Sequence, residues 1–223
     1  SEIVRDNLFI AANTVTAENR RVADAIGINR AKRCTTIKPS GTASLFLGGV
    51  GSGIHPHHSR RYFRRVTANH NESVFKEFKK ANPHMCEEKP NGDWVICFPV
   101  LCSGITQDEI SDINFIDLVL NTYKNWIKPG SDGDFTHNIS CTVPTDNWDE
   151  VADKIWNNRN NVQAISFLPK DDKKYPFMPR QRVATSVEFA AWKALVENYT
   201  PVNYTQGFDD RGAACEGMSC ERI

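Results

Sequence analysis

Hydrophobic residues recur every three or four positions in five stretches of the chain, and this spacing predicts five helices. The last of them opens with Thr185 and carries Glu188 three positions later, a capping-box pattern that marks a helix start. Another is expected to begin at Ser111 or Asp112, because short polar side chains cap helices. The helices are predicted over residues 17–28, 72–82, 111–126, 148–156 and 185–199. Three tryptophans on their apolar faces are expected in the core: Trp148, Trp156 and Trp192.

Short β-branched or apolar runs lie between these helices and predict strands. The run Trp94–Pro99 is continuously apolar, as in a strand that is buried on both faces. Strands are predicted over residues 35–37, 94–99, 138–143 and 164–168, and residues 62–66 are expected to be extended. Because strands alternate with helices, the fold class is predicted to be α/β, with βαβ crossovers and a largely parallel sheet.

A loop of small residues follows the first predicted strand. Pro39 cannot donate to a β-ladder and therefore ends that strand. Bare backbone and hydroxyl groups come next, ahead of a predicted turn of helix, at Ser40, Gly41, Thr42 and Ser44. Free N–H groups in front of a helix attract anions, so a phosphate group fits this loop. The alternative is an ordinary strand-to-helix turn capped by Ser40 or Thr42, since the string is not a Walker loop.

The charge balance of the chain narrows its possible partners. Among 223 residues, 27 Lys and Arg balance 27 Asp and Glu. A general nucleic-acid-binding protein is expected to be basic, so binding of DNA or RNA is not predicted. No apolar run approaches the roughly 20 residues of a membrane span, and no signal peptide is visible at the charged start of the chain. Seven cysteines, several of them in apolar runs, are typical of free thiols in a reducing compartment, so a cytoplasmic protein is expected.

Two of these cysteines lie close together near the end of the sequence. Cys215 and Cys220 are five positions apart in a tail that becomes rich in Gly, Pro and Asp after Thr200. Gly217 between them lets the chain fold back, so the two sulfurs can form a disulfide. Mobility favours thiol–disulfide exchange over a structural role. The alternatives are half of a zinc site, which lacks a second cysteine pair at zinc spacing, or two cysteines without a role.

Two further clusters have both a chemical and a structural interpretation. Three histidines occur within four residues, at His55, His57 and His58, and invite a metal, but no Cys, Asp or Glu lies within several residues. A turn is therefore the preferred interpretation, and no metal is predicted. A set of basic residues also forms a local positive cluster in this neutral chain: Arg33, Lys38, Arg60, Arg61, Arg64 and Arg65. Guanidinium groups suit phosphate, although a solvated charged face explains the same pattern.

Taken together, these motifs resemble the C-terminal part of the monomeric, adenosylcobalamin-dependent (class II) ribonucleoside-triphosphate reductases. The shared motifs occur in the family's order over most of the chain from about residue 17. They are Thr35–Thr42, Gly53–Pro56, Tyr62–Val66, Trp94–Val100, Asn138–Val143, Ile165–Pro169 and the Cys-x-Gly-x-x-Cys string at 215–220. The resemblance implies the C-terminal portion of a ten-stranded α/β barrel over residues 1–199, followed by a flexible redox-active tail over 200–223.

The resemblance also implies roles for individual residues. Ser40, Gly41, Thr42, Ala43 and Ser44 are expected to bind the phosphates of a ribonucleoside triphosphate substrate. Cys215 and Cys220 are expected to re-reduce an active-site disulfide and to be reduced in turn by thioredoxin. Adenosylcobalamin is the implied cofactor, and its role is to generate a thiyl radical.

One family motif is missing from the sequence. The Asn-Pro-Cys-Gly-Glu finger loop, which holds the radical cysteine, does not occur in this chain. The chain is therefore expected to be inactive alone, either as a fragment or as one half of a split enzyme that an upstream polypeptide completes. The competing hypotheses are a non-catalytic nucleotide-phosphate-binding module, a thiol redox adaptor, and a class I reductase large subunit that does not need cobalamin.

Overall fold

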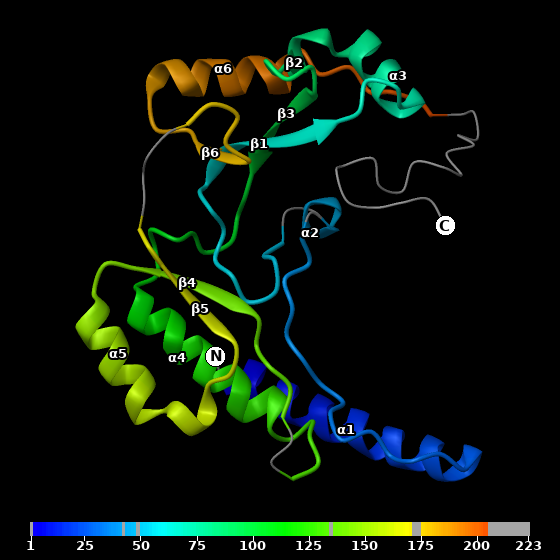
Figure 1. The fold of residues 1–223 in the computed structure, drawn as a ribbon, viewed down its shortest axis with the longest axis vertical. Helices are drawn as coiled ribbons and strands as arrows, with labels where there is room; N and C mark the ends of the chain where they lie inside the picture. The colour runs from blue at the N-terminus through cyan, green and yellow to red at the C-terminus, as the bar shows by residue number, and fades with distance from the viewer. Residues whose placement is uncertain (1, 42, 48–49, 134–135, 171–174, 205–223) are drawn as a thin grey trace. The chain divides into compact units, whose positions relative to one another are not determined.

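The computed structural model describes residues 2–41, 43–47, 50–133, 136–170 and 175–204 of the chain (Figure 1). These residues form two compact units. Unit 1 contains the described residues of 2–57 and 103–170, and unit 2 contains those of 58–102 and 175–204. None of the helices in the described part is both long and apolar enough to cross a membrane.

Unit 1 is built around a parallel pair of strands. β4 (Cys141–Thr145) and β5 (Ile165–Pro169) pair in register from Cys141 opposite Ile165, and α5 (Trp148–Asn157) with the short η3 (Arg159–Asn161) connects them. The helix α4 (Asp112–Thr122) continues into a π-helical turn, η2 (Tyr123–Ile127), and packs against β4 and α5 (Figure 1). The predicted βαβ crossover is confirmed here. Its core consists of Phe115, Ile116, Val119, Tyr123, Ile127, Ile139, Cys141, Val143 and Val151.

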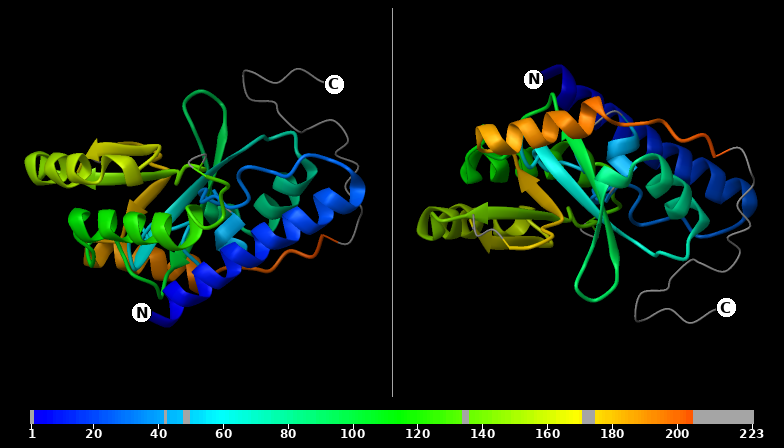
Figure 2. Two further views of the ribbon diagram at one scale, coloured as in Figure 1. Left: turned by 90° about the horizontal axis from the view of Figure 1, so that it is seen from below. Right: turned by 90° about the horizontal axis from the view of Figure 1, so that it is seen from above.

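The first helix of unit 1 is much longer than predicted. α1 (Glu2–Ile26) runs as one continuous helix (Figure 2), so the predicted start near residue 17 is wrong. Its buried positions are small, at Ala12, Thr16 and Ala23, and Thr16 Oγ1 lies 3.3 Å from the carbonyl oxygen of Pro129. Large apolar residues such as Ile10 are exposed instead. The hydrophobic pattern did not predict the first half of this helix, because the residues that α1 buries are small and only weakly hydrophobic.

Unit 2 is an antiparallel sheet in the order β2–β3–β1–β6. Its strands are β1 (Arg61–Ala68), β2 (Cys86–Glu88), β3 (Trp94–Leu101) and β6 (Arg180–Arg182). The helix α3 (Ser73–Ala81) contacts one face of the sheet through the Phe78–Phe98 and Phe75–Trp94 ring pairs, and the short η1 (Pro83–Met85) follows it. The helix α6 (Ser186–Glu197) packs against β3, and Arg61 stacks on its Phe189 and Trp192 rings.

Several predicted elements are confirmed and others are corrected. Ser111 caps α4 by accepting a hydrogen bond from Asn114 N–H, and Thr185 with Glu188 forms the predicted capping box of α6. The prediction of a largely parallel sheet is wrong for Trp94–Pro99, which lies in the antiparallel sheet of unit 2.

Two of the three tryptophans predicted to lie in the core do not. Trp148 and Trp156 are 47% and 67% exposed, whereas Trp192 is 9% exposed and buried as predicted. Both exposed rings belong to α5, whose buried side is carried by Val151. The amphipathic spacing therefore identified the helix but not the depth at which its aromatic residues are buried.

Candidate functional site

The segment that leads into the predicted phosphate loop is clamped to the end of η2. Thr35 Oγ1 donates to the carbonyl oxygen of Trp126 at 2.6 Å, and Trp126 Nε1 donates back to the carbonyl oxygen of Thr36 at 3.1 Å. The Cys34 N–H bonds to Gly130 O at 2.8 Å. The segment forms isolated bridges rather than the predicted strand, and one of them joins Ile37 in parallel to Ile139. These contacts fix the chain immediately before the loop.

The loop itself is partly occupied by its own hydrogen bonds. Ser40 N–H donates to Ser52 Oγ at 3.0 Å, and Ala43 N–H donates to the Ser40 carbonyl oxygen at 3.1 Å. Gly41 has φ +60, a conformation that favours glycine, and Ser44 is buried with its hydroxyl 3.5 Å from the Gly41 carbonyl oxygen. Two of the N–H groups that the sequence suggested as anion donors therefore already have partners in this structure.

Four of the five predicted phosphate-binding residues lie together in this loop, and Thr42 lies outside the described residues. Ser40, Gly41 and Ala43 are exposed, so an incoming group can reach them. The helix that follows, α2 (Ala43–Phe46), is a single turn. Its dipole is correspondingly small, because a macrodipole is the sum of aligned peptide units. Any anion would be held here mainly by local N–H and hydroxyl groups.

A second loop, at residues 51–56, braces the first one. Gly53 approaches the backbone of Lys38 so closely that a Cβ would lie 3.0 Å from its carbonyl oxygen, and its φ is +64. His55 Nε2 accepts the Thr142 N–H at 3.0 Å, which requires the ring proton to be on Nδ1, 2.9 Å from Ser52 O. Sequence reasoning missed this structural role of His55. The only signal was its place in the Gly-Ile-His-Pro string.

An open cavity of about 230 Å³ adjoins these loops. The residues that line it come from the end of the segment before the phosphate loop, from the loop at residues 51–56, and from the starts of β4 and β5. They are Pro39, His55, Ser140, Cys141, Thr142, Ala164 and Ser166. Pockets that enclose a drug-sized ligand usually measure about 300–1,000 Å³. The cavity is thus too small to bury a whole nucleotide, and far too small for a corrin.

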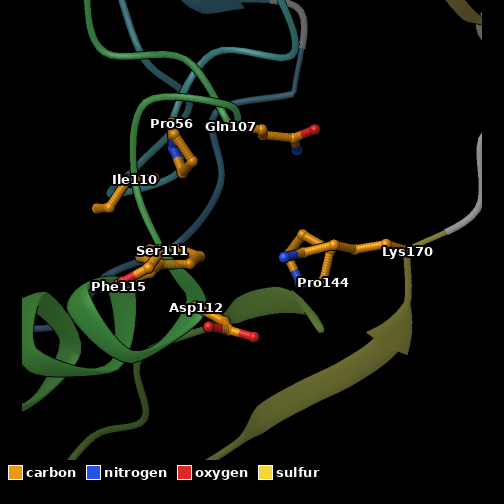
Figure 3. Close-up of a pocket in the computed structure, with 8 residues that line it drawn as sticks. All are labelled: Pro56, Gln107, Ile110, Ser111, Asp112, Phe115, Pro144 and Lys170. Carbon is orange, nitrogen blue, oxygen red and sulfur yellow. The ribbon is translucent and has the colours of Figure 1, made fainter. Parts of the chain in front are cut away.

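A second, smaller cavity lies at the carboxyl ends of β4 and β5, the edge at which α/β proteins commonly bind ligands. Figure 3 shows Asp112 and Lys170 beside it, from the start of α4 and the end of β5. Thr145 Oγ1 donates to Asp112 Oδ2 at 2.5 Å. The cavity measures about 20 Å³, which is room for about one water molecule. It offers no space for a substrate.

The cysteines of the described part are free thiols in half-buried or buried settings: Cys34, Cys86, Cys97, Cys102 and Cys141. Burial raises the pKa of Cys141 to about 11, and burial likewise raises the pKa of Cys97 and Cys102. A thiol is nucleophilic only as the thiolate, so these three are poor redox groups at neutral pH. The predicted redox pair, Cys215 and Cys220, lies outside the described residues.

The raised pKa of Cys141 makes stability depend on pH at alkaline values. The unfolded thiol ionises near pH 9 and the folded one near pH 11, so stability is retained below pH 9 and falls as pH rises through this window. We expect about 2–3 kcal/mol of unfolding free energy to be lost between pH 9 and 11. Urea denaturation at a series of pH values measures it. Cys141→Ala should flatten the slope, and an unchanged slope in that variant would contradict the assignment.

Two of the three histidines that suggested a metal, His55 and His57, make other contacts. The backbone N–H of His57 donates to the carbonyl oxygen of Ile105 at 2.8 Å. The ring of His57 packs so tightly on Gly104 that a Cβ added to Gly104 would lie 2.7 Å from the ring. The two ring nitrogens of His55 form hydrogen bonds with the Ser52 carbonyl oxygen and the Thr142 N–H. Within the described ranges, no group of three or more His, Cys, Asp or Glu side chains is arranged to hold a metal ion.

Comparison with known proteins agrees with the resemblance drawn from the motifs. No family model matches the chain. The adenosylcobalamin-dependent ribonucleoside-triphosphate reductase of Lactobacillus acidophilus is 23% identical over 233 residues, which cover 96% of this chain and 29% of the relative. The reductase of the same name from Lacticaseibacillus paracasei is 23% identical over 182 residues, which cover 77% of this chain and 23% of the relative.

The fold comparison gives the same answer. A crystal structure of a B12-dependent (class II) ribonucleotide reductase superposes with a TM-score of 0.70 at 16% identity, covering 89% of this chain and 28% of that one. The α/β fold inferred from the family resemblance is thereby confirmed. The chain spans less than a third of the length of the relatives that it matches. In sequence and in fold, this chain is therefore similar to one part of the adenosylcobalamin-dependent ribonucleoside-triphosphate reductases.

Proposed function

We propose that this chain is the C-terminal part of an adenosylcobalamin-dependent enzyme that reduces ribonucleoside triphosphates to 2'-deoxyribonucleotides. The observation that supports it best is the combination of sequence similarity to three reductases with the fold match over 89% of the chain. The order of the shared motifs adds to it. Residues 1–199 would form part of the catalytic barrel, and residues 200–223 would form the redox tail.

In this proposal the loop at residues 40–44 binds the substrate phosphates. Ser40, Gly41 and Ala43 are exposed. Ser52 accepts a hydrogen bond from Ser40 N–H, and Gly53 packs against the backbone of Lys38 just before the loop. The existing bond from Ser40 N–H to Ser52 Oγ would have to exchange for a bond to phosphate oxygen. A hydroxyl partner is easily replaced in this way, because the charge-assisted bond to phosphate is roughly twice as strong.

The proposed role of Cys215 and Cys220 is to carry electrons. Reduction of one ribonucleotide consumes two electrons and two protons and releases water, and it leaves an active-site cysteine pair as a disulfide. One tail thiolate attacks that disulfide and the other resolves the mixed disulfide, so the active site regains its dithiol and the tail becomes oxidised. The dithiol of thioredoxin then reduces the tail by the same exchange.

The radical chemistry requires groups that this sequence does not contain. Adenosylcobalamin supplies the radical when it is bound, but neither the 230 Å³ cavity nor the 20 Å³ cavity of unit 1 fits a corrin. In the proposal, an upstream polypeptide carries the finger loop and supplies most of the cofactor site, and the chain alone is inactive.

Nucleotide binding tests the loop assignment. Ser40→Ala combined with Thr42→Val should weaken binding of a ribonucleoside triphosphate to the completed enzyme roughly tenfold, because two hydroxyl contacts to phosphate are lost. Equilibrium binding of labelled ATP measures the change. Thr14→Val is a suitable control, since that hydroxyl bonds to the carbonyl oxygen of Ile10 within the same exposed helix. Unchanged affinity in the double variant would overturn the assignment and leave the redox-adaptor alternative in place.

A further inference from the structure

Two arginines stand directly opposite each other on neighbouring strands of unit 2. In the antiparallel pairing of β1 with β6, Arg64 is the partner of Arg180 and Tyr62 is the partner of Arg182. Directly opposed residues in an antiparallel pair project from the same face of the sheet, and so do residues two apart on one strand. Like charges in this arrangement normally destabilise a sheet. The pair therefore needs a compensating charge or a purpose.

The described part of the chain provides no carboxylate partner for this pair. Within the described residues, neither guanidinium forms an ion pair with Asp or Glu. Arg64 Nη1 donates to the Pro179 carbonyl oxygen at 3.1 Å, while its Nε is buried and has no acceptor. Burial, and after it the charge of Arg180, lowers the pKa of Arg64.

The surroundings of the pair are also positive. The charge of Arg180 acts on the Tyr62 hydroxyl and on the Cys102 thiol as well as on Arg64. Arg60, whose Nη1 donates to the Cys102 carbonyl oxygen at 3.1 Å, acts on the same thiol. Among the described residues, the charged groups that shift the pKa values of Arg64, Tyr62 and Cys102 are Arg60, Arg64 and Arg180.

We propose that Arg64 and Arg180 form a phosphate-binding site on the face of the β1–β6 strand pair (Figure 1). Two positive charges balance the double negative charge of a phosphate dianion, whereas a carboxylate ligand would balance only one of them. Each planar guanidinium can donate two parallel hydrogen bonds to phosphate oxygens. Arg64 is half-buried and Arg180 is exposed, so a phosphate group in solvent can reach both side chains. The ligand class is a phosphate group, either inorganic phosphate or the terminal phosphate of a nucleotide. This site goes beyond the proposed function, which uses the loop at residues 40–44.

The test compares thermal stability with and without phosphate, using the full chain in low-salt buffer. Millimolar inorganic phosphate should raise the melting temperature of the wild type, because a ligand that binds the folded state stabilises it. In Arg180→Gln the affinity for phosphate should fall roughly 10- to 100-fold. Without phosphate, the same variant should melt at or above the wild-type temperature, since a repulsion has been removed. If Arg180 had only a structural role, its replacement would lower the melting temperature without phosphate and would not weaken phosphate binding.

Arg61→Gln is the matched control, because it removes the same charge from the same strand on the opposite face, where Arg61 stacks on Phe189 and Trp192. It should leave phosphate affinity unchanged. A parallel titration with ATP distinguishes the two sources: tighter binding than inorganic phosphate indicates a nucleotide, and equal binding indicates free phosphate. Ser40→Ala with Thr42→Val, measured alongside, separates this site from the loop. No phosphate-dependent shift in the wild type, or equal losses in Arg61→Gln and Arg180→Gln, would overturn the proposal.

Discussion

Replacing Gly130 with alanine is expected to destabilise unit 1 by about 2–4 kcal/mol. The added Cβ would lie 1.9 Å from Thr35 Oγ1 and 2.6 Å from Thr35 Cβ, far inside contact distance. Thr35 cannot move aside cheaply, because it is 2% exposed and its hydroxyl is bonded to the Trp126 carbonyl oxygen. The shift would also disturb the segment that enters the loop at residues 40–44. Urea unfolding of the variant and the wild type measures the loss.

Gly133→Ala provides the matched control for this prediction. Gly133 has φ +69 and nothing within 4 Å of an added Cβ. Alanine there should therefore reduce the free energy of unfolding by only about 1 kcal/mol, the cost of holding a non-glycine residue at positive φ. A double-mutant cycle with Thr35→Gly locates the clash, since Gly130→Ala should cost less in that background. Equal costs for the two alanine variants, with no coupling to Thr35, would show that the close approach is not important.

Replacing Cys215 with serine is expected to reduce thioredoxin-driven turnover of the completed enzyme by at least about 100-fold. Serine cannot form the mixed disulfide, so electrons would no longer pass from thioredoxin to the active site. Turnover driven by a small dithiol should be spared, because such a reductant reaches the active-site disulfide directly. Deoxyribonucleotide formation under the two reductants measures both effects.

Cys34→Ser is the control for this experiment, because Cys34 is a free, half-buried thiol to which the proposal gives no role. It should keep turnover with both reductants. Loss of activity with the small dithiol as well would indicate a damaged fold rather than a broken electron path. Full thioredoxin-driven activity in Cys215→Ser would show that the tail assignment is wrong.

The sequence predicted the elements whose signals are local. Ser111 and Thr185 mark helix starts through bonds to residues three positions away, and such short-range chemistry is visible in the string itself. The direction of strand pairing is not local. The apolar run at Trp94–Pro99 suits a buried parallel strand equally well, but its partners Arg61–Ala68 make it antiparallel. The exposure of Trp148 and Trp156 likewise depends on what lies beside α5, which spacing does not encode.

The candidate site likewise contains some features that the sequence could predict and others that it could not. The small residues at 40–44 were recognisable because Pro, Ser and Gly have conformational meaning at single positions. The restraints that hold the loop were not, because they join residues far apart in sequence. Thr35 meets Trp126 across 91 positions, and His55 meets Thr142 across 87. The opposed pair of Arg64 and Arg180 is of the same kind, since only the register of β1 against β6 brings the two charges together.

The most direct test of the central claim is a reduction assay on this chain together with the polypeptide encoded upstream of it. We expect 2'-deoxyribonucleotide to form from a ribonucleoside triphosphate only when both polypeptides and adenosylcobalamin are present. Deoxyribonucleotide formation without adenosylcobalamin, or no increase in rate when this chain is added to the upstream polypeptide and cofactor, would contradict the account.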